Sequence, residues 1–328
     1  MLGLVVLLTV LSTLVFFFSR SLPGDVAAMY VGDLAKPEQI ERARVELGLD
    51  KPLYIQYIRY WQKLLHGDLG KSLRTHRSVL GDLTQKIPMS LEVVVFALFF
   101  ASWLGVSVGV FAALKQGTWM DEFIKWGASA CVSIPIFFMA LVLQLLFFNA
   151  LGWFPLQGRL DSMLEFTNSI EPITGFSLID CLLTGNFTAL FNVAWHMVLP
   201  VSALFIGPFG FIARLTRSSL LEVMNQDYIL SARASGVSER VLFFRYGLRN
   251  AMSPVITVIG MYVALMLLFT FYVEQIFNWP GIGSYSMYAI LSLDYPVVIG
   301  VIMVIGSVYV ITNTLTDIIR RVIDPRIK

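Results

Sequence analysis

The chain has 328 residues, of which 57% are hydrophobic and only 14% are charged. Soluble globular domains carry about 25% charged residues, so this composition argues against a soluble fold. The formal net charge of +2 gives no indication of nucleic-acid binding. The two cysteines, Cys131 and Cys181, are far apart in the sequence and predict neither a disulfide framework nor a metal site.

Six apolar blocks are each about as long as a membrane span requires. A hydrocarbon core about 30 Å thick needs roughly 20 apolar residues in helical form. Lipid cannot satisfy exposed backbone groups, so each block is expected to be a helix. The sequence therefore predicts an all-α polytopic membrane protein with six transmembrane helices. The blocks are 1–18, 93–114, 123–148, 193–213, 251–273 and 296–316.

The first block, 1–18, has an alternative interpretation as the core of a signal peptide. It is long for such a core, no basic stretch precedes it, and no small-x-small cleavage site follows closely. We therefore expect a retained first helix over residues 1–19.

The distribution of basic residues predicts the orientation in the membrane. The loop 214–250 contains six arginines and the C-terminal tail ends with Arg326 and Lys328, whereas 274–295 contains no Lys or Arg. Because cytoplasmic loops carry the excess of basic residues, both termini are expected inside. This orientation places 20–87 and 149–192 outside.

The segment 20–87 is basic, with 11 Lys and Arg residues against 8 Asp and Glu residues, yet it is assigned to the outside. Loops longer than about 60 residues translocate largely regardless of charge. Helical spacing of apolar residues over 37–47 and 54–65 predicts two helices there. We expect residues 20–90 to form a helical external cap, followed by the core transmembrane domain over 91–328.

The predicted spans contain almost no ionisable residues in their middle, where such groups mark ion-coupled transport. His196, one turn inside the fourth block, is interpreted as an interfacial or packing residue rather than a proton relay. Gly70-Lys71-Ser72 resembles the end of a phosphate-binding loop, but position 65 is Leu65 where that motif needs glycine. The segment 67–70 is therefore expected to be a turn. We predict a chain that is not an enzyme and draws its energy from elsewhere.

The cytoplasmic loop 214–250 predicts two short helices around a turn. Gln226 and Asp227 are suited to begin the first helix, Gly236 to end it, and Ser238 to begin the second. The small residues 231–238 would then project as a knuckle. The alternatives are a basic loop held near anionic lipid and a docking surface for a soluble partner.

Two short runs in this loop, Asp227-Tyr228-Ile229 and Ala232-Arg233-Ala234-Ser235-Gly236, resemble the coupling-loop signature of binding-protein-dependent ABC transporter permeases. Within them, the chain resembles the dipeptide/oligopeptide permease family, first permease subunit type. The leading Glu of the general signature is absent, and Leu230 stands in its place. Other segments along the chain also resemble this family, namely 22–25, 47–49 with Pro52, 67–70 with Ser72, 172–175, 213–217, 277–283, 294–296 and 324–326.

The resemblance implies an importer built from several subunits in the cytoplasmic membrane of a bacterium or archaeon. The expected partners are a second homologous permease subunit, two ATP-binding subunits, an extracytoplasmic solute-binding protein and membrane lipid, but no nucleic acid. ATP and Mg would bind to the ATPases, and this chain would bind no cofactor. Peptide is the expected solute, with nickel chelates, glutathione or oligosaccharides as alternatives. An ion-driven transporter or channel and a membrane scaffold are the competing classes.

The resemblance also assigns candidate site residues. The ATPase-coupling loop would comprise Asp227, Tyr228, Ser231, Ala232, Arg233, Ala234, Ser235, Gly236, Ser238 and Arg240. Trp279, Pro280 and Gly281 are expected either to line an outer gate or docking surface or to form a structural turn. Arg159 and Asp161 are expected to meet the solute-binding protein. Family members usually begin with a basic stretch that this chain lacks, so we expect the natural chain to begin some residues earlier.

Overall fold

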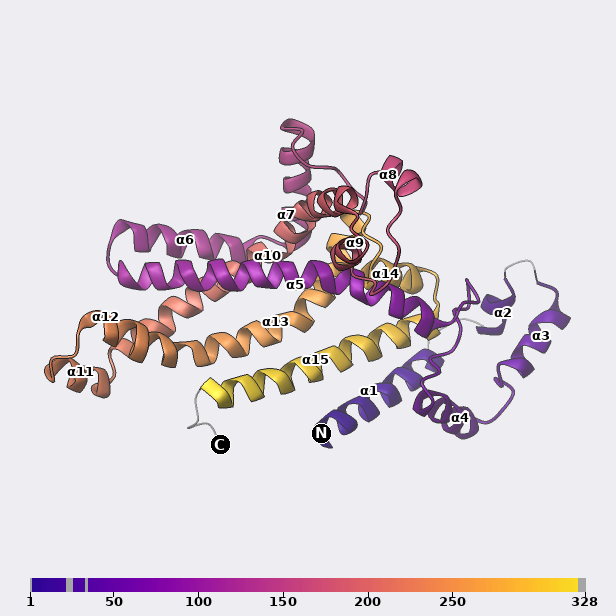
Figure 1. Cartoon of the computed structure of the whole chain (residues 1–328). Helices are drawn as coiled ribbons and strands as arrows, with labels where there is room; N and C mark the ends of the chain where they lie inside the picture. The colour runs from indigo at the N-terminus through magenta and orange to yellow at the C-terminus, as the bar shows by residue number, and fades with distance from the viewer. Residues whose placement is uncertain (1, 22–25, 33–34, 324–328) are drawn as a thin grey trace. The chain divides into compact units, whose positions relative to one another are not determined.

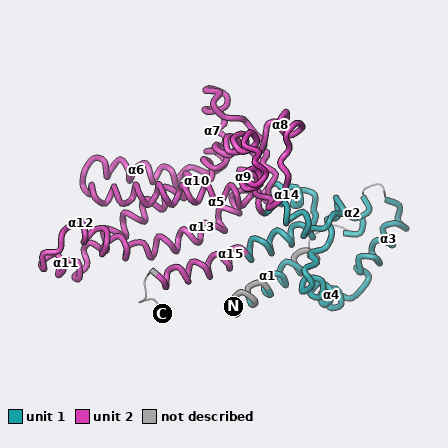
Figure 2. The backbone as a smooth tube through the Cα atoms, in the orientation of Figure 1, with its two compact units in different colours: residues 1–87, 284–307 teal, residues 88–283, 308–328 magenta. Residues whose placement is uncertain are grey.

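In the computed structural model, the chain is mostly helical over the residues that the structure describes, which are 2–21, 26–32 and 35–323 (Figure 1). Within these ranges the only extended pairing is an isolated antiparallel bridge between Lys71 and Ser78. The chain divides into two compact units (Figure 2). Unit 1 comprises residues 1–87 and 284–307, and unit 2 comprises residues 88–283 and 308–328. The segments 22–25 and 324–326, part of the family resemblance, lie outside the described residues.

Unit 1 contains most of the predicted cap, the first apolar block and the first part of the last apolar block. The two helices predicted for the cap are present as α3 (Pro37–Glu46) and α4 (Leu53–Leu65). The predicted turn at 67–70 is also confirmed, since Gly67 and Gly70 have φ angles of 75° and 85°. The remaining elements are α1 (Leu2–Ser21), α2 (Val26–Val31), the first part of α5 (Val79–Leu114), most of α14 (Ile282–Leu291) and the first part of α15 (Tyr295–Ile323).

Unit 2 is organised around the long helices α10 (Phe187–Met224) and α13 (Arg249–Ile276), whose inner faces carry most of its buried core. Proline at positions 200, 208 and 254 lies inside these helices, as membrane helices tolerate. The other elements are α6 (Trp119–Ser133), α7 (Ile136–Leu143), the π-helical η1 (Gln144–Ala150), α8 (Ser162–Thr167), α9 (Ser177–Leu183), α11 (Asp227–Ala234), α12 (Glu239–Val241) and the π-helical η2 (Leu242–Leu248).

Glycines allow α10 to approach its neighbours closely in unit 2. A Cβ atom on Gly105 would lie 2.9 Å from the Ile212 side chain, and one on Gly109 would contact the Ala213 carbonyl at 2.5 Å. On the other side of α10, a Cβ on Gly210 would be 2.5 Å from the Ala128 carbonyl of α6. The Gly-x-x-x-Gly spacing at 105–109 is therefore a helix-packing feature, as such spacings are in membrane proteins.

Four described helices are long and apolar enough to cross a membrane, namely Val79–Leu114, Phe187–Met224, Glu239–Ile276 and Tyr295–Val322. The predicted third span is divided between α6 and α7, which meet at an angle of 102°, and counting this pair as one span raises the number to five. The first predicted block is helical as α1 but is not among these candidates. The fold is thus all-α and polytopic, and the number of six stays a prediction.

The bend in the third block follows from Pro135. Proline has no N–H to donate to the carbonyl of Cys131, four residues earlier, and its ring disfavours helical backbone at the preceding residue. Ile134 accordingly has extended torsion angles, with φ of −82° and ψ of 124°. The apolar run alone indicated one straight helix, because hydropathy does not register the missing hydrogen bond.

Candidate functional site

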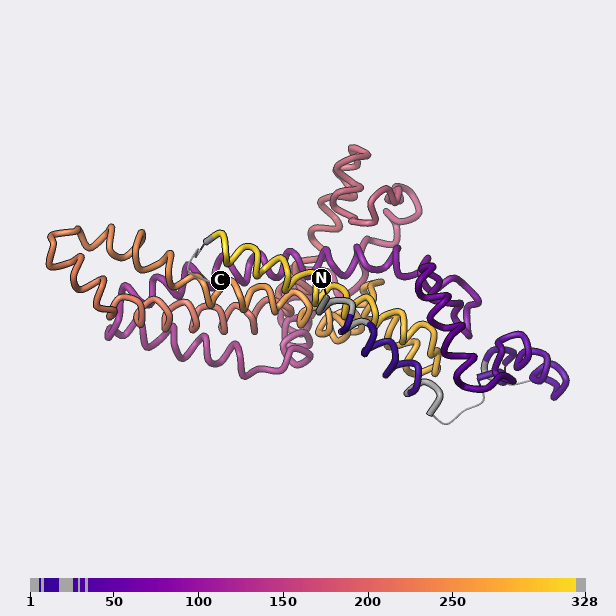
Figure 3. Tube along the Cα trace, turned by 90° about the horizontal axis from the view of Figure 1, so that it is seen from below, coloured from indigo at the N-terminus to yellow at the C-terminus, as the bar shows by residue number. Residues whose placement is uncertain are grey.

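The predicted coupling loop lies at one end of unit 2, and α8 and α9 lie toward the other end (Figures 1 and 3). Helix α10 ends at Met224, α11 follows after two residues, and α12 then continues through η2 into α13. The short α11 is therefore connected to α10 through two residues, and to α13 through α12 and η2.

Gly236 ends α11 as the sequence predicts. Its φ angle of +83° is in the left-handed region that glycine adopts without penalty. The Val237 N–H donates to the Ala232 carbonyl at 3.2 Å and the Gly236 N–H donates to the Arg233 carbonyl at 3.0 Å. This pair of bonds is the Schellman motif, which satisfies the last carbonyls of a helix. Since a Cβ atom on Gly236 would meet no other atom within 4 Å, backbone conformation and not crowding requires glycine here.

One apolar side chain anchors α11, and the rest of the knuckle faces outward. Ile229 is fully buried, whereas Tyr228 and Leu230 are 41% and 48% exposed. The predicted coupling residues that are exposed are Asp227, Tyr228, Ser231, Arg233, Ala234, Ser235, Gly236, Ser238 and Arg240, and Ala232 is half-buried. An exposed surface with two large apolar side chains and several small residues suits close contact with a protein groove.

An ion pair spans the knuckle. Arg233 Nε and Nη2 donate to Glu239 Oε1 and Oε2 at 2.6 and 3.1 Å. Both side chains remain exposed, at 42% and 67%, so the pair contributes little to stability by itself. The helices begin as predicted at Asp227 and Glu239, but neither Gln226 nor Ser238 caps its helix with a side-chain hydrogen bond.

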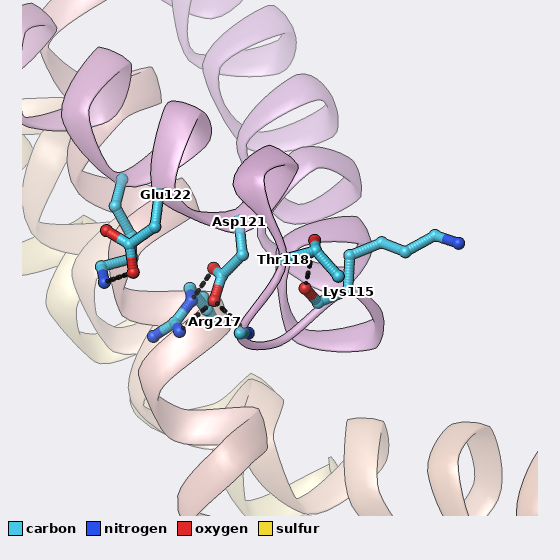
Figure 4. Close-up of polar contacts among 7 residues, drawn as sticks. Lys115, Thr118, Asp121, Glu122 and Arg217 are labelled. Carbon is cyan, nitrogen blue, oxygen red and sulfur yellow. Dashed lines mark hydrogen bonds and ion pairs between the residues drawn. The ribbon is translucent and has the colours of Figure 1, made fainter.

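A buried ion pair links α6 and α10 on the side of the loop 115–118 (Figure 4). Asp121, whose side chain is 1% exposed, accepts hydrogen bonds from Arg217 Nε and Nη2 at 2.5 and 2.7 Å. The Gly117 N–H donates to the same carboxylate at 3.0 Å. Sequence reasoning did not single out Asp121. Two signals were available in the sequence. Asp121 lies in the first turn of an apolar helix, and the loop 214–250 begins with arginines that could pair with it.

The segment around Trp279 is a packed turn. Trp279 is fully buried and its Nε1–H donates to the Met89 carbonyl at 3.1 Å. The buried Ser90 hydroxyl donates to Glu274 Oε1 at 2.5 Å and accepts from the Ile282 N–H at 2.7 Å. A Cβ on Gly281 would overlap with Glu274 and Ser90. Of the predicted gate residues, only Pro280 is exposed.

Arg159 and Asp161 contact α9 and α10. The Arg159 guanidinium is half-buried and donates to the Ser177 hydroxyl at 3.3 Å. The Asp161 carboxylate accepts from Asn192 Nδ2 at 2.6 Å and lies 3.5 Å from His196 Nε2. The His196 side chain, 4% exposed, thus lies beside a carboxylate in the N-terminal part of α10. These contacts give both residues a role inside the chain whatever they meet outside it.

The segment 172–175 is fixed by a carboxylate of α9. Asp180 accepts hydrogen bonds from the Thr174 N–H and hydroxyl at 2.7 and 2.6 Å and from the Gly175 N–H at 3.0 Å. Burial raises the pKa of Asp180, but these hydrogen bonds outweigh it and hold the pKa below its ordinary value. Nearby, buried Glu92 accepts from the Ser177 and Leu178 N–H groups at the start of α9. One carboxylate therefore caps α9, and the other attaches the segment 172–175 to it.

Long apolar helices around a buried core, with an exposed helical knuckle at one end, define a multi-pass membrane protein. Sequence comparison gives the family. Residues 105–328 match the binding-protein-dependent transport system inner membrane component, and residues 1–94 match the corresponding N-terminal membrane component. The chain belongs to this family, the permease component of ABC transporters.

Named relatives align over nearly the whole chain. The probable D,D-dipeptide transport system permease protein DdpB of Escherichia coli K12 is 38% identical, covering 99% of this chain and 95% of the relative. The di/tripeptide transport system permease protein DppB of Pseudomonas aeruginosa is 40% identical over 96% and 93%. A dipeptide transport system permease protein DppB of Alkalihalophilus pseudofirmus is 37% identical over 95% and 93%.

Proposed function

We propose that this chain is the transmembrane permease subunit of an ABC importer and forms half of the pathway for di- and oligopeptides. Relatives that are 37–40% identical over nearly their full length carry dipeptide or di/tripeptide permease names. The observation that carries the mechanism is the exposed Tyr228–Ser238 surface between two membrane helices. Such a surface receives mechanical work from a soluble partner.

The proposed assembly contains a second, homologous permease, two ATP-binding subunits and a solute-binding protein. The knuckle enters a groove on one ATPase, where Tyr228 and Leu230 supply apolar contact and the small residues at 231–236 allow close approach. ATP and Mg bind to the ATPases. Closure of the ATPase pair moves α10 and α13 as rigid bodies and switches access to the pathway.

The proposed topology has six spans, comprising α1, α5, the bent α6–α7 pair, α10, α13 and α15. Both termini and the knuckle are cytoplasmic, and residues 20–90 form an external cap. The basic residues flanking α10, α13 and α15 support this orientation. The membrane is the cytoplasmic membrane of a bacterium or archaeon.

On the outer side, the proposed docking surface for the solute-binding protein includes Pro280 and the exposed Asp161. Trp279 and Gly281 shape the turn that presents Pro280, and Arg159 holds the adjoining segment against α9. Pro280 and Asp161 are therefore the residues of this group that could touch a partner directly.

Reconstitution tests the proposal. The tagged chain is purified from its native membrane, and proteoliposomes are prepared from the resulting complex and from the chain alone. We expect two ATPases and a second permease to accompany the chain, and dipeptide uptake to require both ATP and the complex. Uphill uptake by the chain alone, or uptake abolished by a protonophore but unaffected by ATP depletion, would contradict the proposal.

A further inference from the structure

Unit 1 contains a cavity of about 460 Å³ between α1, α4, the loop 68–71 and the first turns of α15. Phe16 lies five residues before the end of α1, while Tyr295 and Ile299 lie in the first two turns of α15. All three line the cavity. This inference rests on the proposed topology, in which α1 and α15 both cross the membrane, so that the cavity beside the end of α1 and the start of α15 lies at the depth of one membrane surface.

Helix α4 separates this cavity from an exposed apolar surface. Tyr54, Ile58 and Leu65 are 66%, 53% and 77% exposed, at the spacing of one helical face. The opposite face contributes Arg59 and Lys63 to the cavity. A helix with one apolar and one basic face is typical of the interface between lipid headgroups and acyl chains.

Contacts with α1 place the apolar face of α4 beside lipid. The Tyr57 hydroxyl lies 2.8 Å from the Thr13 hydroxyl, and its ring packs against Phe16 and Phe17. Along α1, the exposed side chains Val6, Val10, Leu14 and Phe17 form a single helical stripe. The apolar face of α4 therefore continues the surface that α1 presents to the bilayer.

The cavity wall carries charges of both signs. Three basic residues line it, namely Arg59, Lys63 and Lys71. Within the part of the chain that the structure describes, none of the three forms an ion pair or a side-chain hydrogen bond. Glu46 and Asp68 also line it. The wall can therefore match a ligand that carries a negative and a positive group.

Three buried polar atoms of the wall have no hydrogen-bond partner within the described chain, namely Gln56 Oε1 and the hydroxyl oxygens of Tyr60 and Tyr295. Tyr295 is only 6% exposed, and its hydroxyl makes no hydrogen bond. Gln56 donates through Nε2 to the Lys51 carbonyl at 2.8 Å, but its Oε1 is unpaired. Burying a polar atom without a hydrogen bond costs free energy. The free donor on Tyr295 and the free acceptor on Gln56 therefore indicate a ligand that forms hydrogen bonds with both.

The wall is held in place by Asp294. The Ser72 hydroxyl donates to Asp294 Oδ2 at 2.5 Å, and the Leu73 N–H donates to Oδ1 at 3.1 Å. These bonds fix Lys71 relative to Tyr295, which follows Asp294 directly. The basic loop and the buried tyrosine hydroxyl are thus positioned together before any ligand arrives.

We propose that this cavity binds the headgroup of an aminophospholipid such as phosphatidylethanolamine from the adjoining leaflet. Arg59, Lys63 and the Tyr295 hydroxyl contact the phosphate, since charge-assisted bonds to phosphate are the strong ones available here. Glu46, Asp68 and Gln56 Oε1 accept from the ammonium group. The acyl chains leave along the apolar face of α1. A purely anionic headgroup would leave Glu46 and Asp68 beside a like charge.

Native mass spectrometry of the intact transporter tests this site. The complex is equilibrated with equal amounts of phosphatidylethanolamine, phosphatidylglycerol and phosphatidylcholine, and lipid retained on this chain is measured. We expect one phosphatidylethanolamine per chain, preferred at least about tenfold over the other two. The double variant Arg59→Gln/Lys63→Gln should lower that affinity at least about tenfold, and Tyr295→Phe by several-fold.

Arg42→Gln is the matched control, because Arg42 is an exposed cap arginine outside the cavity, and it should leave retention unchanged. Equal retention of the three lipids, or a double variant that matches the control, would overturn the proposal. Release of the lipid by excess dipeptide would instead assign the cavity to a soluble zwitterion and would overturn it too. Should the double variant fail to fold, Tyr295→Phe decides, because it removes only the hydroxyl.

Discussion

The guanidinium of Arg217 and the carboxylate of Asp121 form two parallel hydrogen bonds of 2.5 and 2.7 Å across 96 residues of sequence. Asp121 lies in the first turn of α6, and Arg217 lies two turns before α10 ends. The pair ties the loop 115–118 to the helix that leads into the knuckle. A displacement of α11 transmitted through α10 therefore reaches α6 as well, so we infer that this pair helps helices α6 and α10 move together.

Removing one member of this pair leaves a buried charge without its partner, which costs about 3 kcal/mol or more. We expect Asp121→Asn and Arg217→Gln each to lower the apparent melting temperature of the purified complex. The double variant should lose less than the sum, because two uncharged side chains can still hydrogen-bond. Additive losses would show that the two residues act separately. Lys125→Gln, which removes an exposed pair with Glu122, is the control and should have little effect.

Substituting alanine for two helical glycines should have opposite effects on stability. Gly109 is packed where α5 contacts α10, whereas Gly127 on α6 faces open space. Gly109→Ala would force a methyl group against the Ala213 carbonyl and should reduce folding yield and melting temperature. Gly127→Ala in α6 meets open space and should stabilise by about 0.5–1 kcal/mol through helix propensity. Thermal unfolding in detergent measures both. A neutral Gly109→Ala would contradict the close approach of α5 and α10.

Asp180 predicts a pH dependence of unfolding. Its pKa is lowered in the folded chain, so the stabilisation is complete above the unfolded value of about 3.9 and is lost as the pH falls through the folded value. The melting temperature of the unaltered chain should therefore exceed that of Asp180→Asn at pH 7, and the two should converge as the pH falls below about 4. A gap that stays constant down to about pH 3 would rule out this carboxylate as its cause.

Local signals made the knuckle predictable from sequence. A helix stop at Gly236 depends on backbone conformation within a few residues. The polar residues at 226–227 and 238–239 indicated the two helix starts, although neither Gln226 nor Ser238 makes a capping hydrogen bond. The α3 and α4 helices follow from local periodicity in the same way. Sequence reasoning therefore predicted the elements of the coupling loop and the outline of the cap without knowledge of their surroundings.

The missed features depend on residues far apart in sequence. Trp279 is buried because Met89 and Ser90 belong to another helix that passes beside it, and no local pattern reports this. The partner of Asp121 lies 96 residues away. The long helices also extend beyond the apolar blocks, so that Glu92 and Glu274, at or beyond the edges of those blocks, are buried inside α5 and α13. Block boundaries mark hydropathy, whereas helix boundaries depend on capping and packing.

Mechanical work is proposed to enter the chain through the knuckle, and a pair of matched glycine variants distinguishes this route from a general effect on folding. Gly236 and Gly185 both have positive φ angles, of 83° and 69°, and a Cβ on either meets no atom within 4 Å. Gly236→Asp and Gly185→Asp therefore carry similar backbone strain, at the knuckle and in the loop after α9. ATP-driven dipeptide uptake and membrane insertion are measured for both. We expect Gly236→Asp to insert normally and lose at least about tenfold of uptake, while Gly185→Asp retains it. Normal uptake by Gly236→Asp would show that the knuckle does not transmit this work.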